Sequence, residues 1–142
     1  MQKNPQLMYP VGERASFSKT ISEADVTTFA GLTGDFGPIH VDAEYARGTR
    51  YGRRTAHEML AGGLISAVLS TRLPGPGSVC LSQQIEFLSP IYIGDTITAQ
   101  VEVVAWQPEK LLITLKTTCQ NQDARQVVTG QAVLMLLKEV MK

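Results

Sequence analysis

A carboxylate and an imidazole stand five residues apart in the stretch FAGLTGDFGPIHVD, where Asp35 and His40 flank the pair Gly37-Pro38. An imidazole has an ordinary pKa of about 6.5, whereas an aspartate is ionised at neutral pH. Two such groups around one water molecule can take a proton from it and deliver one to a substrate, which is general acid–base catalysis. An arbitrary Asp-x4-His pair more often serves only as a turn cap and a structural histidine, so the flanking residues must decide.

The flanking residues supply two further groups with possible chemistry. The segment His57-Glu58-Met59-Leu60 opens an apolar stretch with helical spacing, and its first turn can present main-chain N–H groups to a developing negative charge. The planar guanidinium group of arginine binds phosphate groups well. Any one arginine is nevertheless more simply interpreted as part of a solvated charged loop. Four arginines precede this stretch: Arg47, Arg50, Arg53 and Arg54. We interpret His57 as structural, and Tyr51 and Trp106 as packing or rim residues.

The order of these motifs resembles the signature of the (R)-specific enoyl-CoA hydratases in the MaoC-like family. There, Asp, any residue, Asn, Pro, an aliphatic residue and His are followed about twenty residues later by His-Gly-Met-Leu. The likeness covers nearly the whole chain. It continues through Leu64-Ile65-Ser66, Leu73-Pro74-Gly75-Pro76-Gly77-Ser78, Phe87-Leu88-Ser89-Pro90 and Gly94-Asp95.

The resemblance implies a carbon–oxygen lyase of fatty acid metabolism that adds water to a trans-2-enoyl-CoA, giving an (R)-3-hydroxyacyl-CoA, and catalyses the reverse dehydration. Asp35 and His40 would hold the water, and either could be the formal base. Ser66 would place a hydroxyl near it, although a helix serine can simply bond back to a carbonyl. The Glu58 N–H would bind the thioester carbonyl oxygen. The acyl-CoA substrate would contact Gly37, Pro38, Met59 and the four arginines, and no metal or other cofactor is implied.

Two positions depart from the family pattern: Gly37 replaces the usual Asn, and Glu58 replaces the usual Gly. The first loses an amide that could hold the Asp-His loop in register. The second adds a carboxylate, which keeps open a hot-dog thioesterase that attacks the thioester carbonyl, or a non-catalytic module that binds acyl-CoA or an acyl carrier protein. The spacing Thr55-Ala-His-Glu58 is that of a capping box, which would direct this carboxylate away from the thioester.

The elements that position these residues can be predicted from periodicity and turn residues. We expect a strand over 14–20, a helix capped at Ser22 that ends near Gly31 or Gly34, and a long irregular segment over 35–56 with a helical turn at 43–47. A helix over 57–73, buried nearly all round, should follow, and then strands over 79–88, 96–106, 111–120 and 126–137. The most economical packing is an α+β hot-dog domain spanning 1–142, in which a curved antiparallel sheet wraps the long central helix.

Composition narrows the partners and the location. The chain has 142 residues, 44% of them apolar, and a formal net charge of zero, which gives no general attraction to nucleic acid. Cys80 and Cys119 lie far apart and are expected to be free thiols. No segment resembles a signal peptide or a bilayer span, so we expect a cytoplasmic protein without a membrane partner. An open edge strand predicts a homodimer or a higher homo-oligomer.

Overall fold

The computed structural model describes residues 7–137, which form one antiparallel sheet and four helices. The strands lie in the order β1-β3-β4-β5-β2. Their bounds are Arg14–Thr20 for β1, Ser78–Phe87 for β2, Thr96–Gln107 for β3, Leu112–Gln120 for β4 and Gln126–Leu136 for β5. Every neighbouring pair is antiparallel. All five predicted strands are therefore confirmed, with ends that differ by one residue at most.

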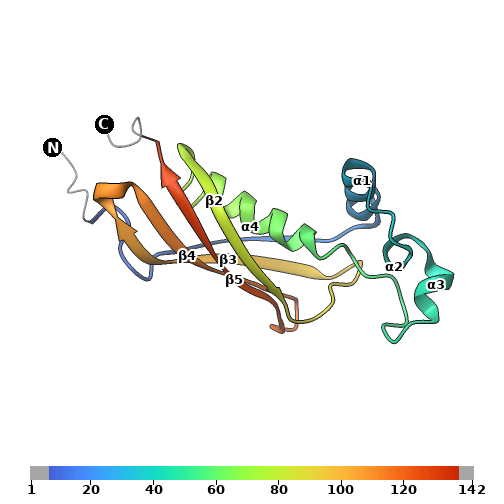
Figure 1. Ribbon diagram of the computed structural model, residues 1–142. Coiled ribbons are helices and arrows are strands. Elements are labelled where there is room, and N and C mark those ends of the chain that lie inside the picture. Colours follow the sequence, from blue (N-terminus) through green and yellow to red (C-terminus); the bar gives the residue numbers. More distant parts are fainter. Residues whose placement is uncertain (1–6, 138–142) are drawn as a thin grey trace.

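The helix α4 (Met59–Thr71) packs against the sheet, chiefly against β3, as Figure 1 shows. Strand β3 alternates between buried and half-buried residues over its first eight positions, as expected of a strand with one apolar face. Its inward side chains are fully buried together with those of α4: Ile97, Ala99, Val101, Val103, Ile65 and Val68. This is the predicted hot-dog arrangement.

One prediction about α4 is wrong. The helix is not buried nearly all round, because Met59, Gly63, Ser66 and Ser70 are exposed. These positions are spaced at four, three and four residues, so they form one line along the helix. We call them the α4 stripe.

Three short helices complete the fold: α1 (Glu23–Thr33), α2 (Pro38–Val41) and α3 (Ala43–Arg47). They gather beyond the N-terminal end of α4 (Figure 1). Ser22 caps α1 through the predicted capping box with Asp25, and Gly34 ends it in the left-handed conformation that glycine favours. The sequence analysis missed α2, which begins at Pro38, where the fixed φ of proline suits a first helical position.

A 3-10 turn, η2 (Pro108–Lys110), joins β3 to β4. Both cysteines are free thiols, as predicted, with Cys80 exposed on β2 and Cys119 buried on β4. Burial raises the pKa of the Cys119 thiol to about 12. Over residues 7–137, no helix is long and apolar enough to cross a membrane.

Candidate active site

The loop between α1 and α2 holds the carboxylate of Asp35 through main-chain contacts. The Gly37 N–H donates to Asp35 Oδ1 at 3.1 Å, and the Asp35 N–H donates to the Thr33 hydroxyl at 3.1 Å. The His40 N–H closes the next turn on the Gly37 carbonyl at 2.9 Å. The loop is therefore held in register without the side-chain amide that Gly37 lacks, and the exposed carboxylate keeps its second oxygen available.

The imidazole of His40 is buried and its orientation is fixed by one main-chain acceptor. His40 Nδ1 lies 2.8 Å from the Thr55 carbonyl oxygen and 3.5 Å from the Thr55 hydroxyl. Because a carbonyl can only accept, Nδ1 carries the proton in the neutral ring. His40 Nε2 is then left with an unshared lone pair, which is the state that a general base requires.

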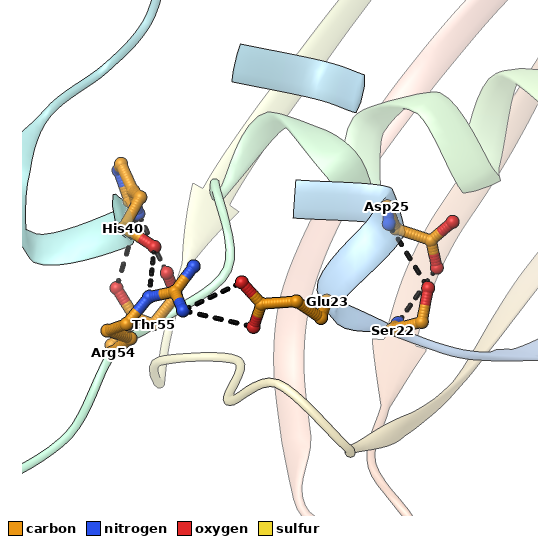
Figure 2. Close-up of polar contacts among 6 residues, drawn as sticks. All are labelled: Ser22, Glu23, Asp25, His40, Arg54 and Thr55. Atoms are coloured by element: carbon orange, nitrogen blue, oxygen red, sulfur yellow. Dashed lines mark hydrogen bonds and ion pairs between the residues drawn. The ribbon is translucent and has the colours of Figure 1, made fainter. Parts of the chain in front are cut away.

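Figure 2 shows that the side chain of Arg54 bonds both to the main chain of His40 and to the carboxylate of Glu23 in α1. Arg54 Nε donates to the His40 carbonyl at 2.7 Å, while Arg54 Nη1 bonds both carboxylate oxygens of Glu23 at 2.8 and 3.0 Å. Glu23 is the first residue of α1, so the contact ties that helix to the loop that carries Asp35 and His40. Arg54 therefore joins α1 to the main chain of His40, a role that the sequence did not indicate.

His57 contacts both Asp35 and His40. Its Nε2 is 2.8 Å from the Asp35 carbonyl oxygen, and its ring stacks on that of His40 with centroids 4.1 Å apart and planes 26° apart. The ring also contacts Phe29, with centroids 4.8 Å apart. His57 is only 1% exposed, which is consistent with the structural interpretation made from the sequence.

Asp35 Oδ1 and His40 Nε2 border the same point in space. A Cβ atom on Gly37 would lie 3.2 Å from Asp35 Oδ1 and 3.9 Å from His40 Nε2. The backbone angles of Gly37, φ −50° and ψ 130°, are open to any residue, so its lack of a side chain matters for space rather than for conformation. The face of Gly37 is thus one wall of the gap between carboxylate and imidazole.

Asp35, His40 and His57 each offer one ligand atom within 4.8 Å of the others, a spacing that invites a test for a metal ion. A metal binds an imidazole nitrogen along its in-plane lone pair, at about 2.0–2.1 Å for zinc. The rings of His40 and His57 are stacked with planes 26° apart, and one nitrogen of each already faces a main-chain carbonyl oxygen. The contacts that the structure shows for the two imidazoles are thus hydrogen bonds and ring stacking.

The start of α4 differs from the sequence prediction. The capping box between Thr55 and Glu58 is absent, because Glu58 itself is the N-cap and its side chain makes no capping bond. Thr55 instead forms an isolated β-bridge with Tyr92, and its N–H donates to the Ile39 carbonyl at 3.1 Å. Within residues 7–137, no hydrogen bond uses the Glu58 N–H. That donor is free, as the resemblance requires.

A cavity of about 300 Å³ opens beside this helix start. Its wall includes Ile39, which precedes His40 in the sequence, Thr55, which contacts the His40 ring, and Glu58. The remaining wall residues are Arg50, Tyr51, Ala56, Phe87, Leu88, Ser89, Pro90 and Ile91. Asp35 and His40 do not line it, so the cavity adjoins the pair on the side of the helix start.

The other predicted site residues lie apart from the pair. Ser66 is exposed on the α4 stripe, where its hydroxyl accepts a hydrogen bond from Gln83 Nε2 at 2.8 Å. Met59 is 53% exposed at the start of the same stripe. Arg47 pairs with Glu44, and the guanidinium of Arg53 lies 4.0 Å from the centre of the Tyr92 ring. None of these contacts reaches Asp35 or His40 within one copy of the chain.

Three contributors escaped the sequence analysis: the Thr55 carbonyl, the Arg54 guanidinium as an anchor, and Glu23. A main-chain acceptor leaves no trace in a side-chain pattern. Glu23 is an ordinary first-turn acid of a helix. Its pairing with Arg54, 31 residues away, follows only from the folded chain.

The hot-dog fold and the Asp-His loop point to the class of protein that the sequence resembles, the MaoC-like hydratases. Comparison with known proteins agrees with this assignment. Residues 9–126 match the model of the MaoC like domain. The chain belongs to this family.

Among its relatives is an (R)-specific enoyl-CoA hydratase of Rhodospirillum rubrum, 48% identical over 125 residues, which cover 88% of this chain and 86% of the relative. A 3-hydroxybutyryl-CoA dehydratase of Methylorubrum extorquens is 43% identical and is aligned over 91% of this chain and 82% of its own. The solved structure of the (R)-hydratase from Aeromonas caviae superimposes with a TM-score of 0.87 at 41% identity, covering 89% of this chain and 96% of the other.

Proposed function

We propose that this protein catalyses the (R)-specific hydration of trans-2-enoyl-CoA to (R)-3-hydroxyacyl-CoA, and the reverse dehydration. The observation that carries the proposal is the shared space in front of Gly37, which Asp35 Oδ1 and His40 Nε2 both border. A ligand atom of Asp35 and one of His40 lie within 4.8 Å of each other, so one water between them can donate to both. The relatives named as enoyl-CoA hydratases and as a 3-hydroxybutyryl-CoA dehydratase support the same chemistry.

In the forward reaction the water oxygen forms a bond to C3 of the enoyl group, and one water proton passes to the catalytic pair. The tautomer of His40 leaves Nε2 unprotonated, so Nε2 accepts the proton. The Asp35 carboxylate orients the water. The electron pair of the double bond moves toward the thioester carbonyl, and a proton from the pair is delivered to C2. Since donor and acceptor flank one water, both new bonds form on the same face.

Negative charge develops on the thioester carbonyl oxygen during this step. The free N–H of Glu58 at the first turn of α4 is suited to donate a hydrogen bond to this oxygen. The adjoining cavity would then hold the thioester. Ser66, on the exposed α4 stripe, would reach the water only from a second copy of the chain.

The test is an assay of crotonyl-CoA that follows enoyl absorbance and free thiol together. We expect absorbance to fall without thiol release, with the (R)-3-hydroxybutyryl-CoA enantiomer as the product. Thiol release would instead indicate a thioesterase that uses the Glu58 carboxylate. Binding without either change would indicate a non-catalytic module.

We further propose that Arg47, Arg50 and Arg53 bind the phosphate groups of CoA. Arg50 lines the 300 Å³ cavity, whereas Arg47 and Arg53 line a second one of about 400 Å³. Arg54 also borders the second cavity, but its Nε and Nη1 atoms are engaged by His40 and Glu23. Lysine at the three proposed positions should raise KM for crotonyl-CoA more than it lowers kcat.

We also propose that two copies pair along β2, which the sheet leaves at an edge. Its exposed apolar side chains include Leu81, 54% exposed, and Phe87, 47% exposed. The small residues of the α4 stripe would let a second helix approach closely. Light scattering at micromolar concentration should show a dimer that Leu81→Lys weakens. Ser16→Lys, on the opposite edge strand β1, should leave the dimer intact.

The proposed location is the cytoplasm, where a reducing environment keeps thiols such as Cys80 and Cys119 free.

A further inference from the structure

We propose that His57 is a positioning residue that sets the placement of Asp35 relative to His40, acting as the Nε2–H tautomer. This inference rests on the proposed function of the pair. One hydrogen bond fixes the main chain of Asp35, and one ring face supports the imidazole of His40. A single buried side chain thus contacts both members of the pair.

The tautomer follows from the contacts of the two ring nitrogens. His57 Nε2 faces the Asp35 carbonyl oxygen at 2.8 Å and must donate to it. His57 Nδ1 is buried and has no hydrogen-bond partner, so a proton there would have no acceptor. The ring therefore keeps its proton on Nε2.

The unpaired Nδ1 also argues against a purely structural role. Leaving a polar atom buried without a partner costs about 1–3 kcal/mol, which a phenylalanine in the same stack would avoid. What a phenylalanine lacks is the donor to Asp35. The imidazole is accordingly explained by its contact with the catalytic loop rather than by packing alone.

His57 would affect the reaction by setting the distance between the Asp35 carboxylate and His40 Nε2. The Asp35 carboxylate is exposed and its Oδ1 accepts one hydrogen bond, from the Gly37 N–H, so the main-chain contacts of the loop determine where it lies. Losing the bond at the Asp35 carbonyl would let the carboxylate move relative to His40 Nε2. A water that both groups must hold tolerates little movement, since misplacement of about 1 Å can cost a hundredfold in rate.

Two variants separate the donor from the ring. His57→Phe keeps an aromatic face against His40 and removes the donor, whereas His57→Gln keeps an N–H near the Nε2 position and removes the ring. We expect kcat for crotonyl-CoA hydration to fall at least tenfold in His57→Phe, with KM changed less than twofold and thermal stability maintained. His57→Gln should recover part of that loss.

Thr117→Val is the matched control. Thr117 is 1% exposed, its hydroxyl also lacks a hydrogen-bond partner, and it lies on β4 outside the site. Its replacement should leave kcat unchanged. A His57→Phe enzyme with the kcat of the parent, or a loss that Gln does not recover at all, would overturn the proposal.

A second measurement is independent of turnover. The chain has only two histidines, so nitrogen-15 NMR of the rings yields two pairs of signals, one pair for each ring, that His40→Ala assigns. We expect the proton on Nε2 in His57 and on Nδ1 in His40. In His57→Phe, the His40 ring nitrogens should shift. A His57 protonated on Nδ1 alone would overturn the positioning role even if hydration is observed. Absence of hydration in the parent protein, with both tautomers as expected, would overturn the proposed function instead.

Discussion

Two regions of this molecule are held by different kinds of contact. In strands β3 and β4, side chains alternate between the core and the other face, and residues such as Ile113 and Leu115 are completely buried. In the segment 34–58, the important contacts join a side chain to a main-chain carbonyl, as at Thr55 for His40 and Asp35 for His57. Stability should therefore depend on the first region and the rate of reaction on the second, and substitutions can test that division.

The largest expected effect is on rate. Asp35→Asn and His40→Ala should each lower kcat for crotonyl-CoA hydration at least about a hundredfold, because each removes one of the two groups that hold the water. Thermal unfolding should change little. Near-parent activity in either variant would show that the pair does not act as inferred.

A core substitution should give the reverse pattern. Leu115→Ala removes a completely buried side chain from β4 and should lower the free energy of unfolding by about 2–5 kcal/mol. Urea denaturation measures this loss. At urea concentrations below the unfolding transition, kcat per folded molecule should stay close to that of the parent. A hundredfold loss of kcat would mean that the two regions are not separable.

Replacing Arg54 should affect the rate of reaction less than replacing Asp35 or His40. Arg54→Lys retains the charge but cannot reproduce both the Nε bond to the His40 carbonyl and the bidentate contact with Glu23. We expect kcat to fall several-fold, less than in the pair itself, because the effect is transmitted through the main chain. Arg14→Lys on β1, whose parent side chain pairs with Glu102, is the control for kcat. Equal kcat values in the two variants would contradict the anchoring role of Arg54.

The smallest expected effect is at Glu58. Because the proposed donor is its main-chain N–H, Glu58→Gln should keep the hydration rate within about twofold of the parent. This corresponds to an activation free energy raised by less than about 0.5 kcal/mol. The same variant of a thioesterase using this carboxylate would lose nearly all turnover. Measuring thiol release and enoyl absorbance on this variant therefore separates the two activities again.

The two regions also differ in how far the sequence predicted them. Alternation and turn residues placed all five strands, and Ser22 with Asp25 identified the start of α1. At α4 the pattern of Thr55 and Glu58 indicated a capping box, but pairing of Thr55 with Tyr92 outweighed that local preference. Asp35 and His40 became candidates through the family resemblance of the motifs that flank them, because their type and spacing alone do not decide. Their supports, which are carbonyl oxygens and an ion pair spanning 31 residues, have no signature in the sequence.

The bridge between Thr55 and Tyr92 gives part of the segment 34–58 the protection of a sheet. The Ala56 N–H donates to the Ile91 carbonyl at 2.7 Å, immediately beside the carbonyl that orients His40. Ala56 is buried, whereas Phe36, near the other end of the segment, is 61% exposed. In hydrogen–deuterium exchange, the amide of Ala56 should accordingly exchange as slowly as a strand amide, and that of Phe36 much faster. The imidazole would then be attached to the slowly opening part of the molecule, and the carboxylate to the part that opens readily.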